Sequence, residues 1–173
     1  DIGANIGVFS IYASMKKKVK VYAFEPDPNS FIELYNAIHL NKVDVTPMLV
    51  ALDNNKESKY FNMNNFETGL SDNFLSKEKI NKSGFILTTD KIDDIISEGI
   101  TLAPNYIKID VDGNEKNILD GMIETLKNDR LKSILIEIES IDQFKYYETF
   151  LKTFGFKIIS KMNSETGNNI FTR

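Results

Sequence analysis

The first seven residues, Asp-Ile-Gly-Ala-Asn-Ile-Gly, are of types that suit the binding of a charged ligand. Gly3 and Gly7 permit a tight turn in which backbone N–H groups approach a ligand at the start of the following helix. Glu25 ends an apolar segment 18 residues after Gly7. This is close to the ~20-residue spacing at which a carboxylate binds ribose hydroxyls in nucleotide sites. The pattern predicts a nucleotide-type cofactor site.

The spacing of the glycines indicates which cofactor this is. A dinucleotide motif, Gly-x-Gly-x-x-Gly, needs a glycine where Asn5 stands, and here Asp1 precedes the first glycine. A carboxylate at that place would repel a pyrophosphate but suits a ligand with an amino group and a cationic sulfonium. A nicotinamide dehydrogenase is therefore disfavoured, and S-adenosylmethionine is favoured.

Further carboxylates follow two apolar segments later in the chain. Asp110, Asp112 and Glu115 come after the first segment, and Glu137 lies near the end of the second. The first group resembles a calcium loop, but its glycine is at the fourth position and not the sixth, so we predict no metal. Carboxylates at the ends of strands in an open α/β sheet lie where ligands bind. For Asp112 and Glu115, capping of the next helix is an equal alternative.

Short apolar segments alternate with helical patterns along the chain, which predicts an α/β fold with a mostly parallel sheet. Pro47 indicates an edge strand, and the last two strands read as an antiparallel hairpin. We expect the irregular stretch 54–84 to be an insertion facing the ligand. The predicted strands are 19–24, 43–52, 59–63, 85–89, 106–111, 135–138, 157–161 and 169–172, and the predicted helices are 5–18, one from Pro28, 90–97, 115–127 and 143–154.

An ordered set of motifs resembles the FkbM family of methyltransferases over almost the whole chain. The motifs are Asp1 to Gly7, Phe24-Glu25-Pro26, Ala51-Leu52-Asp53, Ile107 to Gly113 with Glu115, and Ile136-Glu137. The resemblance implies a Rossmann-like methyltransferase fold with a seven-stranded type of sheet, helices on both faces, and S-adenosylmethionine as cofactor. In this fold the glycine turn follows the central strand, so we expect an apolar strand upstream of residue 1. The 173 residues would then be most of a single domain.

The resemblance also implies roles for individual residues. Asp1, Gly3, Asn5 and Gly7 would line the methionine part of the cofactor, with Ala4 among the cofactor-binding residues. Glu25 would bind the ribose hydroxyls, Asp53 would lie near the adenine, and Asp110 would lie at the edge of the cofactor and substrate pocket. One departure is Asp112, where the family usually has glutamate.

The expected reaction is methylation of a hydroxyl on a sugar or another small-molecule or glycan acceptor. The hydroxyl must lose its proton during or before its attack, and a carboxylate of the pocket could accept it; we expect Asp110 in this role, with Glu137 as the second candidate. The alternative is a non-catalytic module on the same fold that binds S-adenosylmethionine or another nucleotide-type ligand.

Several residues have an ordinary structural interpretation. We expect His39 to be partly exposed on a helix, and Asp93 and Asp94 to be helix-surface charges. The cluster of Asn62, Asn64 and Asn65 could bind a polyhydroxyl substrate, although compositional bias is the favoured explanation.

Composition excludes several other classes of function. The chain has no cysteine and one histidine, which excludes thiol catalysis and cysteine zinc sites and disfavours a Ser-His-Asp triad. The net charge of −4 argues against a nucleic-acid partner. No stretch reaches the ~18 apolar residues of a membrane span, and no signal peptide is visible, so we expect a cytoplasmic protein. The sequence leaves the oligomeric state open.

Overall fold

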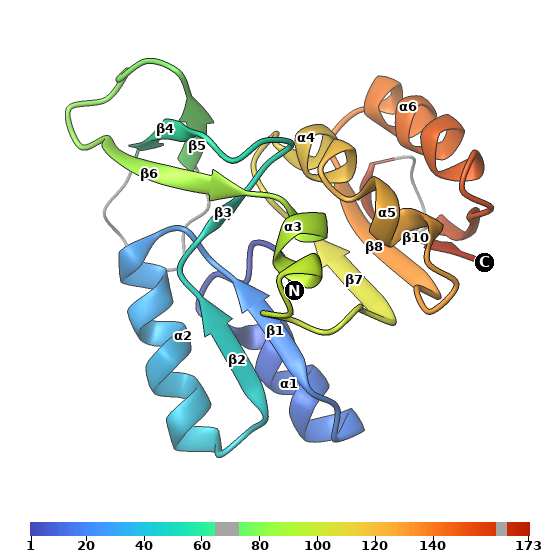
Figure 1. The fold of residues 1–173 in the computed structure, drawn as a ribbon, viewed down its shortest axis with the longest axis horizontal. Coiled ribbons are helices and arrows are strands. Elements are labelled where there is room, and N and C mark those ends of the chain that lie inside the picture. The colour runs from blue at the N-terminus through green and yellow to red at the C-terminus, as the bar shows by residue number, and fades with distance from the viewer. Residues whose placement is uncertain (65–72, 162–165) are drawn as a thin grey trace.

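The computed structural model describes residues 1–64, 73–161 and 166–173. Its main sheet is built around the N-terminus, which Figure 1 shows in the middle of the molecule. Strand β1 (Val21–Phe24) pairs in parallel with β2 (Val45–Met48), and β7 (Tyr106–Ile109) pairs in parallel with β8 (Ser133–Ile138). Ile2 forms parallel bridges to both Phe24 and Ile109, so this residue joins the two halves of the sheet.

The sheet ends in the expected hairpin. Strand β10 (Gly167–Thr172) is antiparallel to both β8 and β9 (Lys157–Lys161), which gives the order β7-β8-β10-β9. At the opposite edge, Pro47 lies on β2 beside Ala23 of β1. A proline is tolerated there because its missing N–H costs no ladder hydrogen bond. The predicted fold class is confirmed, with a mixed and not wholly parallel arrangement.

A second sheet has the order β3-β6-β4-β5. Its strands are β3 (Ala51–Leu52), β4 (Ser58–Met63), β5 (Asn73–Ser76) and β6 (Phe85–Asp90). The expected single strand 43–52 is therefore wrong, because β2 and β3 belong to different sheets. The chain turns between them, where the Val50 N–H donates to the Met48 carbonyl at 3.0 Å.

The helices are α1 (Val8–Lys17), α2 (Pro28–Asn41), α3 (Ile92–Ser97), α4 (Glu115–Asp120), α5 (Ile123–Lys127) and α6 (Ile141–Lys152). Successive residues of β1 belong to two different apolar clusters. Ala23 packs with Leu34 and Ile38 of α2, whereas Phe24 packs in the larger cluster with residues of α3 to α6. Because neighbouring residues of a strand point to opposite faces, helices cover both faces of the sheet, as expected.

One predicted helix, 115–127, is broken into α4 and α5 at Gly121. A Cβ at Gly121 would lie 2.2 Å from the carbonyl oxygen of Asp53, so the helix passes directly over that backbone. Asp93 of α3 caps the start of α5 from outside that helix. Its carboxylate accepts the N–H groups of Glu124 and Thr125, both at 2.8 Å. Asp93 is thus a helix cap, and its expected role as a surface charge is wrong.

Helix α1 begins later than expected. Asn5 and Gly7 have φ angles of 51° and 92°, which are incompatible with a right-handed helix, so α1 starts at Val8. Phe9 is exposed, whereas Ser10 and Ser14 are buried. Tyr35 of α2 is also exposed. Within the described residues, no helix is long and apolar enough to cross a membrane.

Candidate cofactor and active site

A cavity of about 330 Å³ lies at the carboxyl ends of β1 and β7. This is the edge of an α/β sheet at which ligands bind. The turn at residues 2–6, the loop before β3, strand β5 and the end of β7 contribute to its wall. Its lining residues include Gly3, Ala4, Asn5, Phe9, Glu25, Ala51, Leu52, Asn73, Phe74, Lys108, Asp110, Asp112 and Asn114. Strand β5 places part of the 54–84 stretch on the cavity, as expected.

The glycine turn is packed tightly against the end of β7. Gly3 has a φ of 72°, and a Cβ there would lie 1.9 Å from the carbonyl oxygen of Asp110. Gly7 does not line the cavity; its absent side chain leaves room for Leu34 of α2, because a Cβ would lie 2.5 Å from the Leu34 Cδ1. Close backbone approach thus explains the first glycine, and helix packing explains the second.

The N–H groups of the turn are largely used within the protein, contrary to the expectation that they approach a ligand. Those of Gly3 and Ala4 donate to the Phe24 carbonyl at 3.1 and 3.0 Å. The Asn5 N–H donates to the Glu25 carboxylate at 2.7 Å. The turn therefore supplies the shape of the cavity wall more than it supplies donors.

Glu25 lies in the cavity wall with only 7% of its surface exposed. One carboxylate oxygen accepts the Asn5 N–H, and the other accepts the Asp27 N–H at 2.8 Å. Burial raises the pKa of Glu25 to about 7, although these two hydrogen bonds act in the opposite direction. Since each carboxylate oxygen can accept two hydrogen bonds, the group can still accept a hydroxyl of a ligand.

Sequence reasoning missed Lys108, which lines the cavity from β7. Its ammonium lies 2.7 Å from Asp110 Oδ2 and 3.4 Å from Asp1 Oδ1, and 4.6 Å from the centre of the Phe9 ring. A lysine between two buried isoleucines of an apolar strand was the available signal, because such a cation is buried only with a partner. Asp1 itself does not line the cavity; its carboxylate accepts the Ser10 hydroxyl at 2.6 Å.

Asp110 and Glu137 are hydrogen-bonded to each other. Burial by itself would raise the pKa of Asp110, but the hydrogen bonds with Glu137 and Lys108 lower it overall. The bond with Asp110 raises the pKa of Glu137 to about 7, and burial adds to this effect. Asp110 lines the cavity, whereas Glu137 is exposed and outside the lining. The two candidate catalytic residues are thus brought together, in different environments.

Asp112 and Glu115 separate in the structure. Asp112 is exposed and lines the cavity, whereas Glu115 is buried and does not. The Glu115 carboxylate accepts the Gly113 N–H at 3.3 Å and is hydrogen-bonded to Tyr147 of α6. Burial raises the pKa of Glu115 to about 7. Its position in the first turn of α4 fits the capping alternative.

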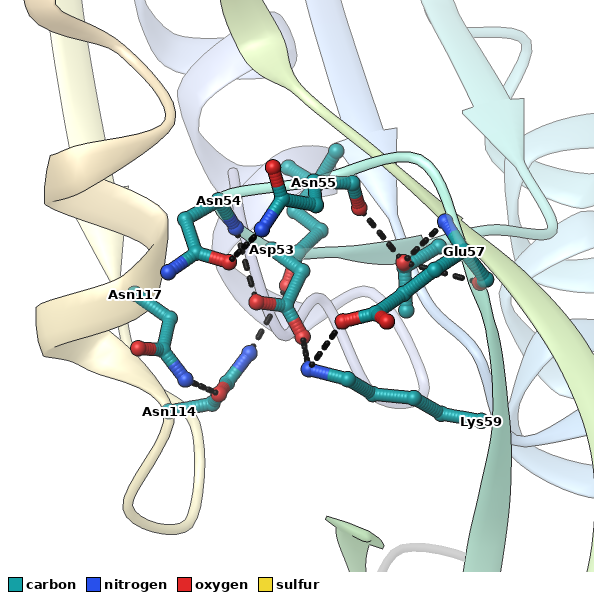
Figure 2. A network of polar contacts seen from close by, with 9 residues as sticks. Asp53, Asn54, Asn55, Glu57, Lys59, Asn114 and Asn117 are labelled. Carbon is teal, nitrogen blue, oxygen red and sulfur yellow. Dashed lines mark hydrogen bonds and ion pairs between the residues drawn. The ribbon is translucent and has the colours of Figure 1, made fainter. Parts of the chain in front are cut away.

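Asp53, for which the resemblance implies a place near the adenine, is not among the residues that line the cavity. Its side chain is fully buried, 2.6 Å from the ammonium of Lys59, and it also accepts the Asn54 N–H at 2.7 Å. Figure 2 shows the Lys59 ammonium between the carboxylates of Asp53 and Glu57. The preceding Leu52 lines the cavity instead.

The remaining candidates have structural roles or lie outside the described residues. Asn62 is fully buried, and its amide oxygen accepts the N–H groups of Ile80 and Asn81, so it holds a turn and is not placed to bind a substrate. Asn65 lies outside the described residues. His39 is exposed, as expected. No group of acidic or histidine side chains in the described ranges could hold a metal ion.

Comparison with known proteins identifies relatives of the chain. Residues 1–158 match the family model described as "Methyltransferase FkbM domain". A curated relative, the hexuronic acid methyltransferase AglP of Haloferax volcanii, is 26% identical over 141 residues, which cover 81% of this chain. The chain spans 55% of the length of that relative.

Two solved structures share the fold. The methyltransferase FkbM from Methylobacillus flagellatus KT has a TM-score of 0.67 at 16% identity, covering all of this chain and 42% of the other. The precorrin-6y C5,15-methyltransferase of Geobacter metallireducens GS-15 has a TM-score of 0.57 at 14% identity, covering all of this chain and 77% of the other. At these identities the likeness concerns the fold.

Proposed function

The chain belongs to the FkbM family of methyltransferases, and we propose that it transfers the methyl group of S-adenosylmethionine to a hydroxyl of a sugar or another small-molecule or glycan acceptor. The observation that carries this proposal is the cavity at the ends of β1 and β7, where the Gly3 turn, Glu25 and Asp110 meet. The activity of the curated relative on a hexuronic acid supports a sugar acceptor.

The residues of the cavity fit S-adenosylmethionine. When bound, this cofactor supplies an electrophilic methyl group on a cationic sulfur. The Glu25 carboxylate is suited to accept the ribose hydroxyls, the Gly3 turn would contact the methionine part, and Asp110 would lie at the edge between cofactor and acceptor. Asp110, Asp112 and Glu25 line the cavity together with one basic residue, Lys108, so the described lining favours a cation.

Asp110 is suited to act on the acceptor. Its lowered pKa keeps the carboxylate ionised at neutral pH, so it can take the proton of a hydroxyl while the oxygen of that hydroxyl attacks. The sheet edge fixes its position, because the Asp110 N–H donates to the Ile2 carbonyl at 3.1 Å. Fixed alignment of the reacting groups is the main contribution that a protein makes to such a displacement.

Calorimetry with S-adenosylmethionine and with its demethylated product tests cofactor binding. We expect Glu25→Gln to weaken binding about tenfold or more, as the loss of a hydrogen bond to a charged group does. Glu33→Gln is the matched control, because Glu33 is an exposed carboxylate on α2. Equal affinity of the Glu25 variant and the wild type would contradict this assignment.

A methyl-release assay then distinguishes an enzyme from a binding module. Extracts incubated with cofactor labelled in its methyl group, followed by mass spectrometry, report both turnover and the acceptor. We expect Asp110→Asn to bind the cofactor but to lose turnover. Binding without transfer to any acceptor would favour the non-catalytic alternative.

A further inference from the structure

Lys108, Asp110 and Glu137 form a connected polar group at the carboxyl ends of β7 and β8. Lys108 and Asp110 are two positions apart on one strand path, so their side chains share a face. The parallel register pairs Ile109 with Ile136, and Asp110 and Glu137 are the next residues of the two strands. Hydrogen bonds link Lys108 to Asp110 and Asp110 to Glu137.

The ammonium of Lys108 is enclosed on several sides. Its side chain is 12% exposed, with Asp110 at 2.7 Å, Asp1 at 3.4 Å and the Phe9 ring over it. Ser10 binds the other oxygen of Asp1, which holds that carboxylate against α1. Lys108 is the one basic residue that the structure describes in the cavity lining. The cation is therefore fixed beside Asp110.

We propose that Lys108 is a positioning residue, which holds Asp110 ionised inside the cavity and leaves the single proton of the Asp110–Glu137 pair on Glu137. This inference deepens the proposed function and rests on it for its catalytic meaning. Two carboxylates in contact cannot both ionise easily, so they share one proton. A cation on one side of the pair decides which carboxylate keeps that proton, and of these two carboxylates the cation is paired with Asp110.

The other charges around the pair favour the same assignment. Asp112 and Glu139 both raise the pKa of Glu137, in addition to the larger effect of Asp110 itself. Asp1 is the other carboxylate near the Lys108 ammonium, at 3.4 Å. Because Glu137 is exposed, its proton can exchange with water without crossing the cavity. The acceptor hydroxyl would thus meet an ionised base, while the proton stays at the surface.

Carbon-13 NMR titration of side-chain carboxyls tests this in the free protein. The protein is labelled at Asp and Glu carboxyl carbons, and Asp110→Asn and Glu137→Gln identify the two signals. In the wild type we expect Glu137 to titrate near pH 7. We expect Asp110 to become protonated only at a pH well below the ordinary titration range of an aspartate. Lys108→Met should move the Asp110 titration to higher pH by roughly one to three pH units, and Lys108→Arg should restore it.

The matched control is Lys116→Met, which removes an exposed lysine 2.6 Å from Asp120 and should leave both signals unchanged. An unchanged Asp110 titration in folded Lys108→Met would overturn the proposal. If that variant does not fold, Glu137→Gln decides. In it, Lys108 alone must keep the titration of Asp110 below the ordinary pH range of an aspartate. An Asp110 titration at or above that range would refute the proposal. Since no cofactor or acceptor is present, this result is separate from any failure of methyl transfer.

Discussion

Replacing Gly3 by alanine would test whether close backbone approach shapes the cavity. The substitution has two physical effects. The residue has a φ of 72°, and a left-handed conformation costs an alanine about 1–2 kcal/mol. In addition, the new Cβ would lie 1.9 Å from the carbonyl oxygen of Asp110, which is a backbone atom at the end of β7 and cannot rotate away.

Gly99 provides a control that has the first effect without the second. Its φ is 74°, and an added Cβ there meets no atom within 4 Å. We expect Gly99→Ala to cost about 1–2 kcal/mol in the free energy of unfolding. Gly3→Ala should cost about 1–3 kcal/mol more, the usual range for forced overpacking. It should also weaken cofactor binding, because the turn must shift away from Asp110.

Urea unfolding followed by circular dichroism measures both free energies, and calorimetry measures the affinity for S-adenosylmethionine. Comparable unfolding free energies for Gly3→Ala and Gly99→Ala would refute the close approach. Unchanged affinity in a destabilised Gly3→Ala would refute the role of the turn in shaping the site.

Three further substitutions test other contacts. Lys59→Met leaves the Asp53 carboxylate buried without its cation and should lower the free energy of urea unfolding by about 3–5 kcal/mol. The control Lys56→Met, at a more exposed pair, should have little effect, and similar losses in the two variants would contradict the buried pairing. Burial raises the pKa of Glu115 from 4.5 to about 7. The folded protein therefore holds this proton more tightly than the unfolded chain, and the free energy of unfolding falls as the pH rises from about 4.5 to about 7. Glu115→Gln should therefore gain about 3 kcal/mol relative to the wild type at pH 8 and little at pH 4, and a gain that does not depend on pH would contradict the cause. Asp93→Ala removes three hydrogen bonds at the start of α5 and should lower the thermal unfolding free energy by about 1–2 kcal/mol without changing cofactor affinity; no loss of stability would contradict its role as a cap.

Local signals in the sequence predicted most elements well. Pro28 begins α2, as expected, and the strand 59–63 is present as β4. Near the C-terminus, the helix expected at 143–154 is present as α6. These features depend on residues close together in the chain, so their spacing is enough to predict them.

Contacts between distant segments account for the errors. The break after α4 depends on Asp53 passing beneath Gly121, and the start of α5 depends on Asp93. The two strands predicted as one separate because β2 pairs with β1 whereas β3 pairs with β6. Neither periodicity nor composition within a segment contains this information.

The sequence by itself determined the family, the α/β class and the set of carboxylates from which a site could be built. Only the tertiary structure decided which of them lie together. Glu25 and Asp110 line the cavity, whereas Asp53 is buried and paired with Lys59. The tertiary structure also placed Lys108 beside Asp110, which the apolar pattern of β7 had obscured. The physical reason is that the charge state of a carboxylate depends on its burial and its partners, and these come from segments far apart in the chain.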